Sequence, residues 1–200
     1  MNDPGGVNER PTLLTVGHGT HAETEFAALL LSAGVAAVVD VRIAPGSRRF
    51  PQFGRAALEE WLPAAGISYC WERRLGGFRK LPSNSPDVAL RNTSFRAYAA
   101  HMRTPEFAAA MGQIVARAAA EPTALMCSES LWWRCHRRLI ADHARLIRHL
   151  EVCHILPDGR LSRHELMAGV RVSGSGLLYD GLPATDPLPF PDDDAPDHCS

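Results

Sequence analysis

The chemically richest part of the sequence is the segment 124–139, which reads ALMCSESLWWRCHRRL. It combines two thiols, a carboxylate, an imidazole and three guanidinium groups, carried by Cys127, Glu129, Arg134, Cys135, His136, Arg137 and Arg138. The apolar residues at its start predict a short buried strand, and the basic residues at its end predict a helix. Open α/β sheets place their sites where such a strand ends and the next helix begins. We therefore expect a functional site at this segment.

Two residues of the segment compete for the reactive role. A thiol at the end of a strand that faces a helix N-terminus has a lowered pKa and is nucleophilic, which favours Cys127. Glu129 opposes that shift, and it could itself act as a general acid, a general base or a nucleophile in glycosyl transfer. The spacing from Cys127 to Arg134 is one residue longer than in the Cys-x5-Arg loop of thiol phosphatases, and the loop has no glycine. A buried structural thiol is the alternative interpretation of Cys127.

The same residues are also candidate metal ligands. Cys127, Cys135 and His136, together with His18, could form a tetrahedral site for zinc or another soft metal. The Cys-x7-Cys-His spacing is not that of a zinc knuckle, so the sequence by itself requires no cofactor. A zinc site is therefore an alternative to the catalytic interpretation of these residues.

The elements that must position this segment alternate along the chain. Short apolar, β-branched runs predict strands at residues 12–16, 35–41, 67–71, 123–127 and 151–156. Helical spacing of apolar residues predicts helices between them, one of which begins with Thr104, Pro105 and Glu106. We expect an amphipathic surface helix over 134–149 and a last helical turn at 164–167. This alternation predicts a three-layer α/β sandwich with a mostly parallel, Rossmann-like sheet.

Polar side chains follow several of these strands where each one ends. His18 follows the first strand, Asp40 and Arg42 end the second, and Cys127 ends the fourth. The carboxyl ends of parallel strands meet at one edge of the sheet, so a shared cleft is expected there. We expect Cys127, Glu129, His18 and His136 to be catalytic. The residues expected to bind substrate are Asp40, Arg42, Ser47, Arg48 and Arg137.

Composition sets the domain boundaries and the class of partner. We expect a flexible N-terminus at 1–11, a single α/β domain at 12–172 and a disordered acidic tail at 173–200, which holds six Asp and no Lys or Arg. All but one of the 21 basic residues are arginine, which favours anionic partners because guanidinium groups bind carboxylate and phosphate bidentately. The N-terminus is not a secretory signal, no run approaches the ~18 apolar residues of a membrane span, and five scattered cysteines favour a reduced, cytoplasmic setting.

An ordered series of short motifs resembles the family called domain of unknown function 488. The motifs are GHGT at 17–20, DVRIAPGS at 40–47, LGG at 75–77, CSE at 127–129, WRCHR at 133–137, LIAD at 139–142 and HILPDG at 154–159. The resemblance covers about residues 12–172 and implies an α/β domain. It implies shared residues at His18, Asp40, Arg42, Pro45, Ser47, Arg48, Cys127, Glu129, Cys135, His136 and Arg137, and it supplies no reaction. At Gly19 many members carry Ser.

We expect from these observations an enzyme that acts on an anionic substrate, nucleotide-like or phosphorylated, at the carboxyl edge of the sheet. The alternative is a non-catalytic module that binds a small ligand or a nucleic-acid fragment through basic residues of 73–80 and 134–148, with a structural metal held by Cys and His.

Overall fold

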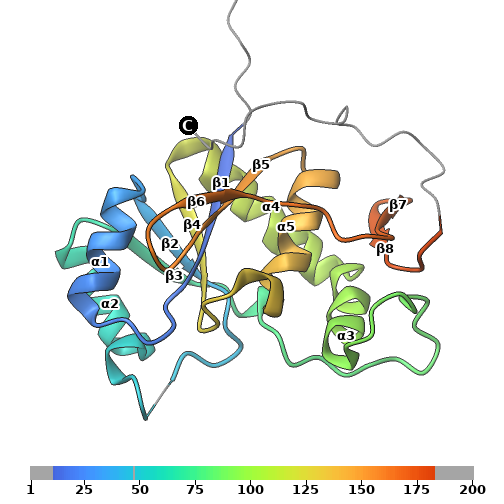
Figure 1. Ribbon diagram of the computed structural model, residues 1–200, viewed down its shortest axis with the longest axis horizontal. Coiled ribbons are helices and arrows are strands. Elements are labelled where there is room, and N and C mark those ends of the chain that lie inside the picture. The colour runs from blue at the N-terminus through green and yellow to red at the C-terminus, as the bar shows by residue number, and fades with distance from the viewer. Residues whose placement is uncertain (1–10, 47, 183–200) are drawn as a thin grey trace, which may run out of the picture.

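The fold is a twisted sheet of six strands with helices on both faces (Figure 1). The computed structural model describes residues 11–46 and 48–182. The strands are β1 (Thr12–Gly17), β2 (Ala37–Asp40), β3 (Ser68–Trp71), β4 (Thr123–Cys127), β5 (Glu151–Ile155) and β6 (Leu161–Arg163). Their order is β3-β2-β4-β1-β5-β6, and all neighbours are parallel except β5 and β6. The predicted strands at 12–16, 35–41, 67–71, 123–127 and 151–156 are all confirmed, with small shifts at their ends.

Helices cover the two faces of the sheet unequally. One face carries α1 (Glu23–Ser32) and α2 (Arg55–Ala64), and the other carries α3 (Thr93–Met102), α4 (Pro105–Ala120) and α5 (Arg137–Leu146). Helix α4 begins as predicted, because the Thr104 hydroxyl accepts a hydrogen bond from the Phe107 N–H and Pro105 occupies the first helical position. This confirms the predicted three-layer α/β sandwich with a mostly parallel sheet.

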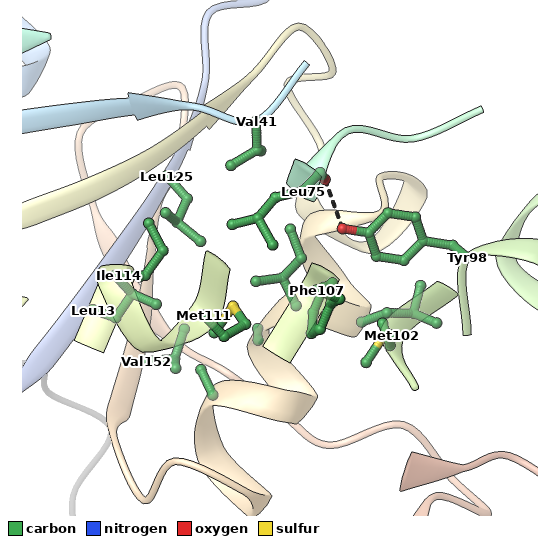
Figure 2. Close-up of a cluster of buried hydrophobic side chains, with 14 of the residues drawn as sticks. Leu13, Val41, Leu75, Tyr98, Met102, Phe107, Met111, Ile114, Leu125 and Val152 are labelled. Atoms are coloured by element: carbon green, nitrogen blue, oxygen red, sulfur yellow. Dashed lines mark hydrogen bonds between the residues drawn. The ribbon is translucent and has the colours of Figure 1, made fainter. Parts of the chain in front are cut away.

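The central strands are apolar at nearly every position because both of their faces are buried. In β2, Val38 packs in the cluster beneath α1 and α2, while Val39 packs in the cluster on the opposite face. The larger cluster lies between the sheet and helices α3, α4 and α5, and Figure 2 shows Leu13, Leu125 and other side chains filling it. Two clusters on opposite faces hold the strands in a fixed register, and thus fix where each strand ends.

Helix α5 is not the surface helix that the sequence predicts. Every residue of Arg137–Leu146 except Arg138 is buried, so that prediction is wrong. The helix packs against β5 and α3, and Tyr179, which follows a hairpin of β7 (Arg171–Ser173) and β8 (Gly176–Leu178), donates a hydrogen bond of 2.9 Å to the buried Asp142. The carboxylate of Asp142 is therefore satisfied inside the protein rather than by water.

Asp142 also begins a buried chain of polar groups that crosses from α5 to the sheet. Its carboxylate contacts His164 at 2.9 Å, His164 contacts His154 at 2.9 Å, and His154 contacts the Thr15 hydroxyl at 2.7 Å. The Trp132 ring stacks on His154 with a centroid distance of 4.0 Å. The chain joins α5, the residue after β6, β5 and β1, so it fastens α5 to the half of the sheet that it covers.

Two further predictions need correction in this region. Residues 164–167 do not form a helical turn, because His164 directly follows β6 and its N–H pairs with the Val152 carbonyl. The disordered tail was expected from residue 173, yet β7 and β8 continue the fold and Tyr179 is fully buried. The chain beyond 182 lies outside the described residues. In the part of the chain that is described, no helix combines the length and apolar character needed to cross a bilayer.

Candidate functional site

The carboxyl ends of the parallel strands open onto a cavity of about 330 Å³, here called the rim cavity. It is lined by His18, Gly19, Arg42, Ile43, Ala44, Gly46, Phe50, Gly77, Phe78, Cys127, Ser128 and His136. These residues follow β1, β2, η2 (Arg73–Leu75) and β4, and His136 immediately precedes α5. The structure thus brings His18, Arg42, Cys127 and His136, four of the predicted site residues, to one cavity from separate segments.

Arg42 is held in place by Asp40 and by the Phe53 carbonyl. Its Nε and one terminal nitrogen donate to Asp40 at 2.8 and 2.5 Å, and the latter nitrogen also donates to the Phe53 carbonyl at 2.9 Å. Tyr69 donates a further hydrogen bond of 3.0 Å to Asp40, and burial together with that carboxylate raises the pKa of Tyr69. Asp40 is fully buried, so it positions Arg42 and balances its charge rather than contacting a ligand.

His18 is fixed as a neutral base beside Arg42. Its Nδ1 lies 3.1 Å from the Gly19 carbonyl, which can only accept, so Nδ1 carries the proton and Nε2 presents its lone pair to Arg42 at 3.3 Å. The ring stacks on Phe53 with centroids 4.1 Å apart. Burial, and then the positive charge of Arg42, lowers the pKa of His18 to about 4. The imidazole is therefore uncharged near neutral pH, and its Nε2 lone pair accepts a hydrogen bond from Arg42.

Cys127, Cys135 and His136 form a compact cluster at the floor of the cavity. The two sulfur atoms and one imidazole nitrogen all lie within 4.8 Å of one another, and Cys135 Sγ lies 3.6 Å from His136 Nδ1. His136 Nε2 donates to the Val41 carbonyl at 3.0 Å, so Nδ1 faces the thiols with a free lone pair. Cys127 and His136 reach the cavity, whereas Cys135 lies behind them.

The pKa values of the two thiols are shifted in opposite directions, because Cys127 donates a hydrogen bond to Cys135. The hydrogen bond from Cys127 lowers the pKa of Cys135, and the nearby Arg137 guanidinium lowers it further. The same hydrogen bond, followed by burial, raises the pKa of Cys127. Cys127 therefore holds the proton, and the predicted lowering of its pKa by a helix N-terminus does not occur. Here α5 begins only at Arg137, after the intervening 3₁₀ helix Trp132–Arg134.

Arg137 is buried behind the cavity and supports the residues that line it. It is 1% exposed, and its Nε donates to Cys135 Sγ at 3.5 Å. One terminal nitrogen donates to the Glu129 carbonyl and, at 3.5 Å, to the Ser130 carbonyl. The described residues that line the cavity do not include it. Arg137 thus holds the turn after β4 in place instead of reaching a ligand directly.

Three other predicted residues occupy different positions. The Glu129 carboxylate accepts a hydrogen bond of 3.1 Å from the Leu131 N–H, and the described lining residues do not include Glu129. Arg48 is exposed on the loop that passes the cavity at Gly46. Ser47 lies outside the described residues. Of the two candidates for the reactive group, Cys127 therefore reaches the cavity.

Two aromatic residues at the cavity were not among the sequence candidates. Phe50 and Phe78 both line it, and Phe78 is 92% exposed with a positive φ of 57°. A bulky residue rarely adopts this backbone conformation. Because the ring is exposed, packing in the hydrophobic core does not account for it. The available signal was an aromatic residue directly after Gly76 and Gly77 in a long loop.

The arginines of the basic segment are mostly turned away from solvent. Arg137 and Arg145 are buried, Arg138 lies over the Trp132 ring at 5.9 Å, and Arg148 donates to the Ala108 carbonyl at 2.9 Å. Of the five, Arg134 is exposed. Most of these arginines are therefore not available to form the extended positive surface that was expected to bind nucleic acid.

Residues 23–144 match the model of a protein family described as Domain of unknown function DUF488. The chain belongs to this family. The matched range of the DUF488 chain contains Asp40, Arg42, Cys127, Cys135 and His136, whereas His18 and β5 lie outside it. No curated protein and no solved structure matched the DUF488 chain. Its chemistry must therefore be argued from the rim cavity itself.

Proposed function

We propose that this chain is an enzyme that acts on a nucleotide-like anion bound in the rim cavity. The observation that carries the proposal is the meeting of an arginine, a neutral buried histidine and two aromatic rings in one cavity of about 330 Å³. A cavity with a few convergent polar groups and a histidine of perturbed pKa is the usual setting of an active site.

Arg42 supplies the recognition of the anion. The bonds to Asp40 fix its guanidinium group, so little side-chain entropy is lost when a ligand binds. Arg42 lines the cavity, and its remaining terminal nitrogen, which contacts His18, carries a second N–H for an oxygen of phosphate or carboxylate. An anion that binds this nitrogen therefore lies next to His18, whose Nε2 must exchange its hydrogen bond from Arg42 before it accepts a proton from the ligand.

Phe50 and Phe78 supply the recognition of a planar ring. Stacking of a base on an aromatic side chain contributes about 1–3 kcal/mol to binding. The exposure of Phe78 in a strained backbone conformation supports such a role, because ligand binding would then cover the ring. In this proposal His18 accepts a proton in the reaction, while Cys127 and His136 line the reacting end of the cavity.

Binding is tested by calorimetric titration of the full chain with adenosine 5′-monophosphate, adenosine and inorganic phosphate. We expect the monophosphate to bind best, because it alone engages both Arg42 and the rings. Phe78→Ala should weaken its binding about tenfold, a factor within the range of one lost stacking contact. Val88→Ala removes an exposed side chain outside the cavity and should leave the affinity unchanged. Equal binding of adenosine and its monophosphate, or equal losses in the two variants, would contradict this mode of recognition.

Turnover is tested by incubating the chain with common nucleoside mono-, di- and triphosphates and analysing products by mass spectrometry. His18→Gln should retain binding and lower the rate by about 10²–10⁴-fold, as loss of a general base does. Binding without turnover of any of these nucleotides would overturn the enzymatic proposal and leave a non-catalytic ligand-binding module.

A further inference from the structure

The cluster at the floor of the rim cavity has the composition of a metal site. Among the described residues, it is the group of potential ligands whose donor atoms lie within 4.8 Å of one another, and it consists of Cys127, Cys135 and His136. Two sulfurs and one imidazole nitrogen are soft and borderline donors, which select zinc and similar thiophilic ions over magnesium or calcium. We propose that these three residues bind a thiophilic divalent cation, for which zinc is the best match.

The spacing of the donor atoms agrees with tetrahedral zinc. Zinc–sulfur bonds of about 2.3 Å and zinc–nitrogen bonds of about 2.0 Å at tetrahedral angles separate sulfur from nitrogen by roughly 3.5 Å. The observed distance between Cys135 Sγ and His136 Nδ1 is 3.6 Å. A cation could therefore be accommodated with small side-chain rotations and without movement of the backbone.

The orientation of His136 is already that of a metal ligand. Ligating histidines almost always donate their second N–H to a carbonyl or carboxylate, which fixes the ring and its tautomer. Here Nε2 donates to the Val41 carbonyl at 3.0 Å, and the ring packs on Tyr98 with centroids 5.0 Å apart. The lone pair of Nδ1 therefore points toward the two sulfurs in the absence of any rearrangement.

The charges also balance. Two thiolates and a neutral imidazole carry a charge of minus two, which a divalent cation neutralises inside a buried site. Arg137 Nε lies 3.5 Å from Cys135 Sγ and supports a ligand that bears negative charge. Cys127 and Cys135 are 7% and 5% exposed, so uncompensated thiolates there would be costly.

Three protein ligands leave one position of a tetrahedral ion open. His18, which the sequence suggested as a fourth ligand, is outside the cluster, since its nitrogens contact Gly19 and Arg42 among the described residues. Cys127 and His136 line the rim cavity, so the open position faces the space where a ligand binds. Three protein ligands and one exchangeable position are typical of catalytic zinc sites. This catalytic use rests on the proposed function, whereas the binding of the metal does not.

The test begins with the full chain, prepared reduced and free of metal, titrated with zinc in competition with a chromophoric chelator. We expect one zinc per chain, with affinity lowered at least 100-fold in Cys127→Ser, Cys135→Ser and His136→Asn. Cys70→Ser is the matched control, because Cys70 is a half-buried thiol on β3 outside the cluster, and its affinity should equal that of the wild type.

Cobalt substitution reports the ligands directly. The wild type should show tetrahedral d–d bands and thiolate-to-cobalt charge transfer, with the charge-transfer intensity falling by about half in either Cys→Ser variant because one of two thiolates is lost. Zinc should raise the Tm of the wild type and Cys70→Ser but not of Cys135→Ser, which separates metal loss from misfolding.

The opposing outcomes are equally definite. Absence of zinc binding, formation of a Cys127–Cys135 disulfide in place of the metal complex, or an equal loss in Cys70→Ser would overturn the metal site. The nucleotide titration is repeated on metal-free protein. Nucleotide binding without zinc binding refutes the metal site alone, and zinc binding without nucleotide binding refutes the proposed function alone.

Discussion

Asp40 and Arg42 illustrate how single residues build this site. They stand two positions apart at the end of β2, and the guanidinium group contacts Asp40, the Phe53 carbonyl and His18 together. Asp40 is fully buried and Arg42 is 7% exposed, so neither charge can be compensated by bulk water. Removing either residue would therefore leave the charge of the other buried and uncompensated. The contact between Arg42 and His18 also makes the orientation of His18 depend on this ion pair.

Substitution Asp40→Asn should lower the free energy of unfolding by about 3–5 kcal/mol, because it leaves the Arg42 charge buried without its carboxylate. Urea unfolding at neutral pH measures the difference. The control is Glu59→Gln, which breaks the half-exposed Arg55–Glu59 pair at 2.7 Å and should change stability by less than about 1 kcal/mol. Similar losses of unfolding free energy in the two variants would show that the buried ion pair contributes no more to stability than the exposed one.

The positions of the site residues could be predicted from the sequence, but the directions of their side chains could not. His18, Arg42 and Cys127 follow apolar runs, and the ends of parallel strands meet at one edge, so their convergence follows from topology. Glu129 is different, because its carboxylate caps its own turn at the Leu131 N–H, and that depends on the conformation of a few loop residues. Phe78 belongs to a long loop in which no periodicity reports its position.

At the scale of elements, the turn that follows β1 and the turn that follows β4 are packed backbone against backbone. The His18 N–H donates to the Cys127 carbonyl at 3.0 Å, and the Gly19 N–H donates to the Ser128 carbonyl at 3.1 Å. A Cβ atom on Gly17 would lie 2.0 Å from the Glu129 carbonyl oxygen. Glycine is therefore required at this position by contact rather than by its φ angle.

Gly17→Ala should destabilise the protein by about 1–3 kcal/mol, the usual cost of overpacking, because the turn 127–130 must move to make room. It should also weaken binding of adenosine 5′-monophosphate, since Cys127 and Ser128 line the cavity. Thermal unfolding and calorimetry measure the two effects. The control Gly112→Ala, in α4 with open space around the added methyl, should instead stabilise by about 0.5–1 kcal/mol. Wild-type stability in Gly17→Ala would contradict the close packing of the turns.

The elements themselves were predicted where local signals are strong. The start of α4 follows from the capping residue and proline alone. The burial of α5 could not be predicted in this way, because it depends on packing against α3 and β5 and on Tyr179, which follows the short hairpin β7–β8. From the sequence, polar residues such as Asp142 and His143 are therefore expected on a solvent-exposed face of the helix. In the structure, tertiary contacts bury them.

At the scale of the whole molecule, buried histidines make stability depend on pH. Burial, and then the charge of His164, lowers the pKa of His154 to about 2, and burial followed by the charge of Arg148 lowers the pKa of His143 to about 3. Both rings are neutral in the folded protein throughout the range in which a histidine of the unfolded chain takes up a proton, near pH 6.5. Their contribution is complete above that pH and is lost as the pH falls below it.

Between pH 6 and pH 4 these two residues should make the free energy of unfolding fall by about 3 kcal/mol per pH unit, since the unfolded chain binds about two more protons. Urea unfolding at several pH values measures the slope. His143→Leu should remove about half of this contribution while stability at pH 7.5 is retained, because no residue in the described part of the chain forms a hydrogen bond with the buried His143 Nδ1. A slope that is unchanged in His143→Leu would show that another group titrates.

The central position of β1 in the sheet also affects how the chain folds while it is being synthesised on the ribosome. β1 is the first described strand to be synthesised, yet both of its neighbours, β4 and β5, are encoded more than a hundred residues later. At a synthesis rate of about 5–20 residues per second, its two edges stay unpaired for on the order of ten seconds. The nascent chain therefore exposes an unpaired apolar strand until β4 and β5 have been synthesised and pair with its two edges.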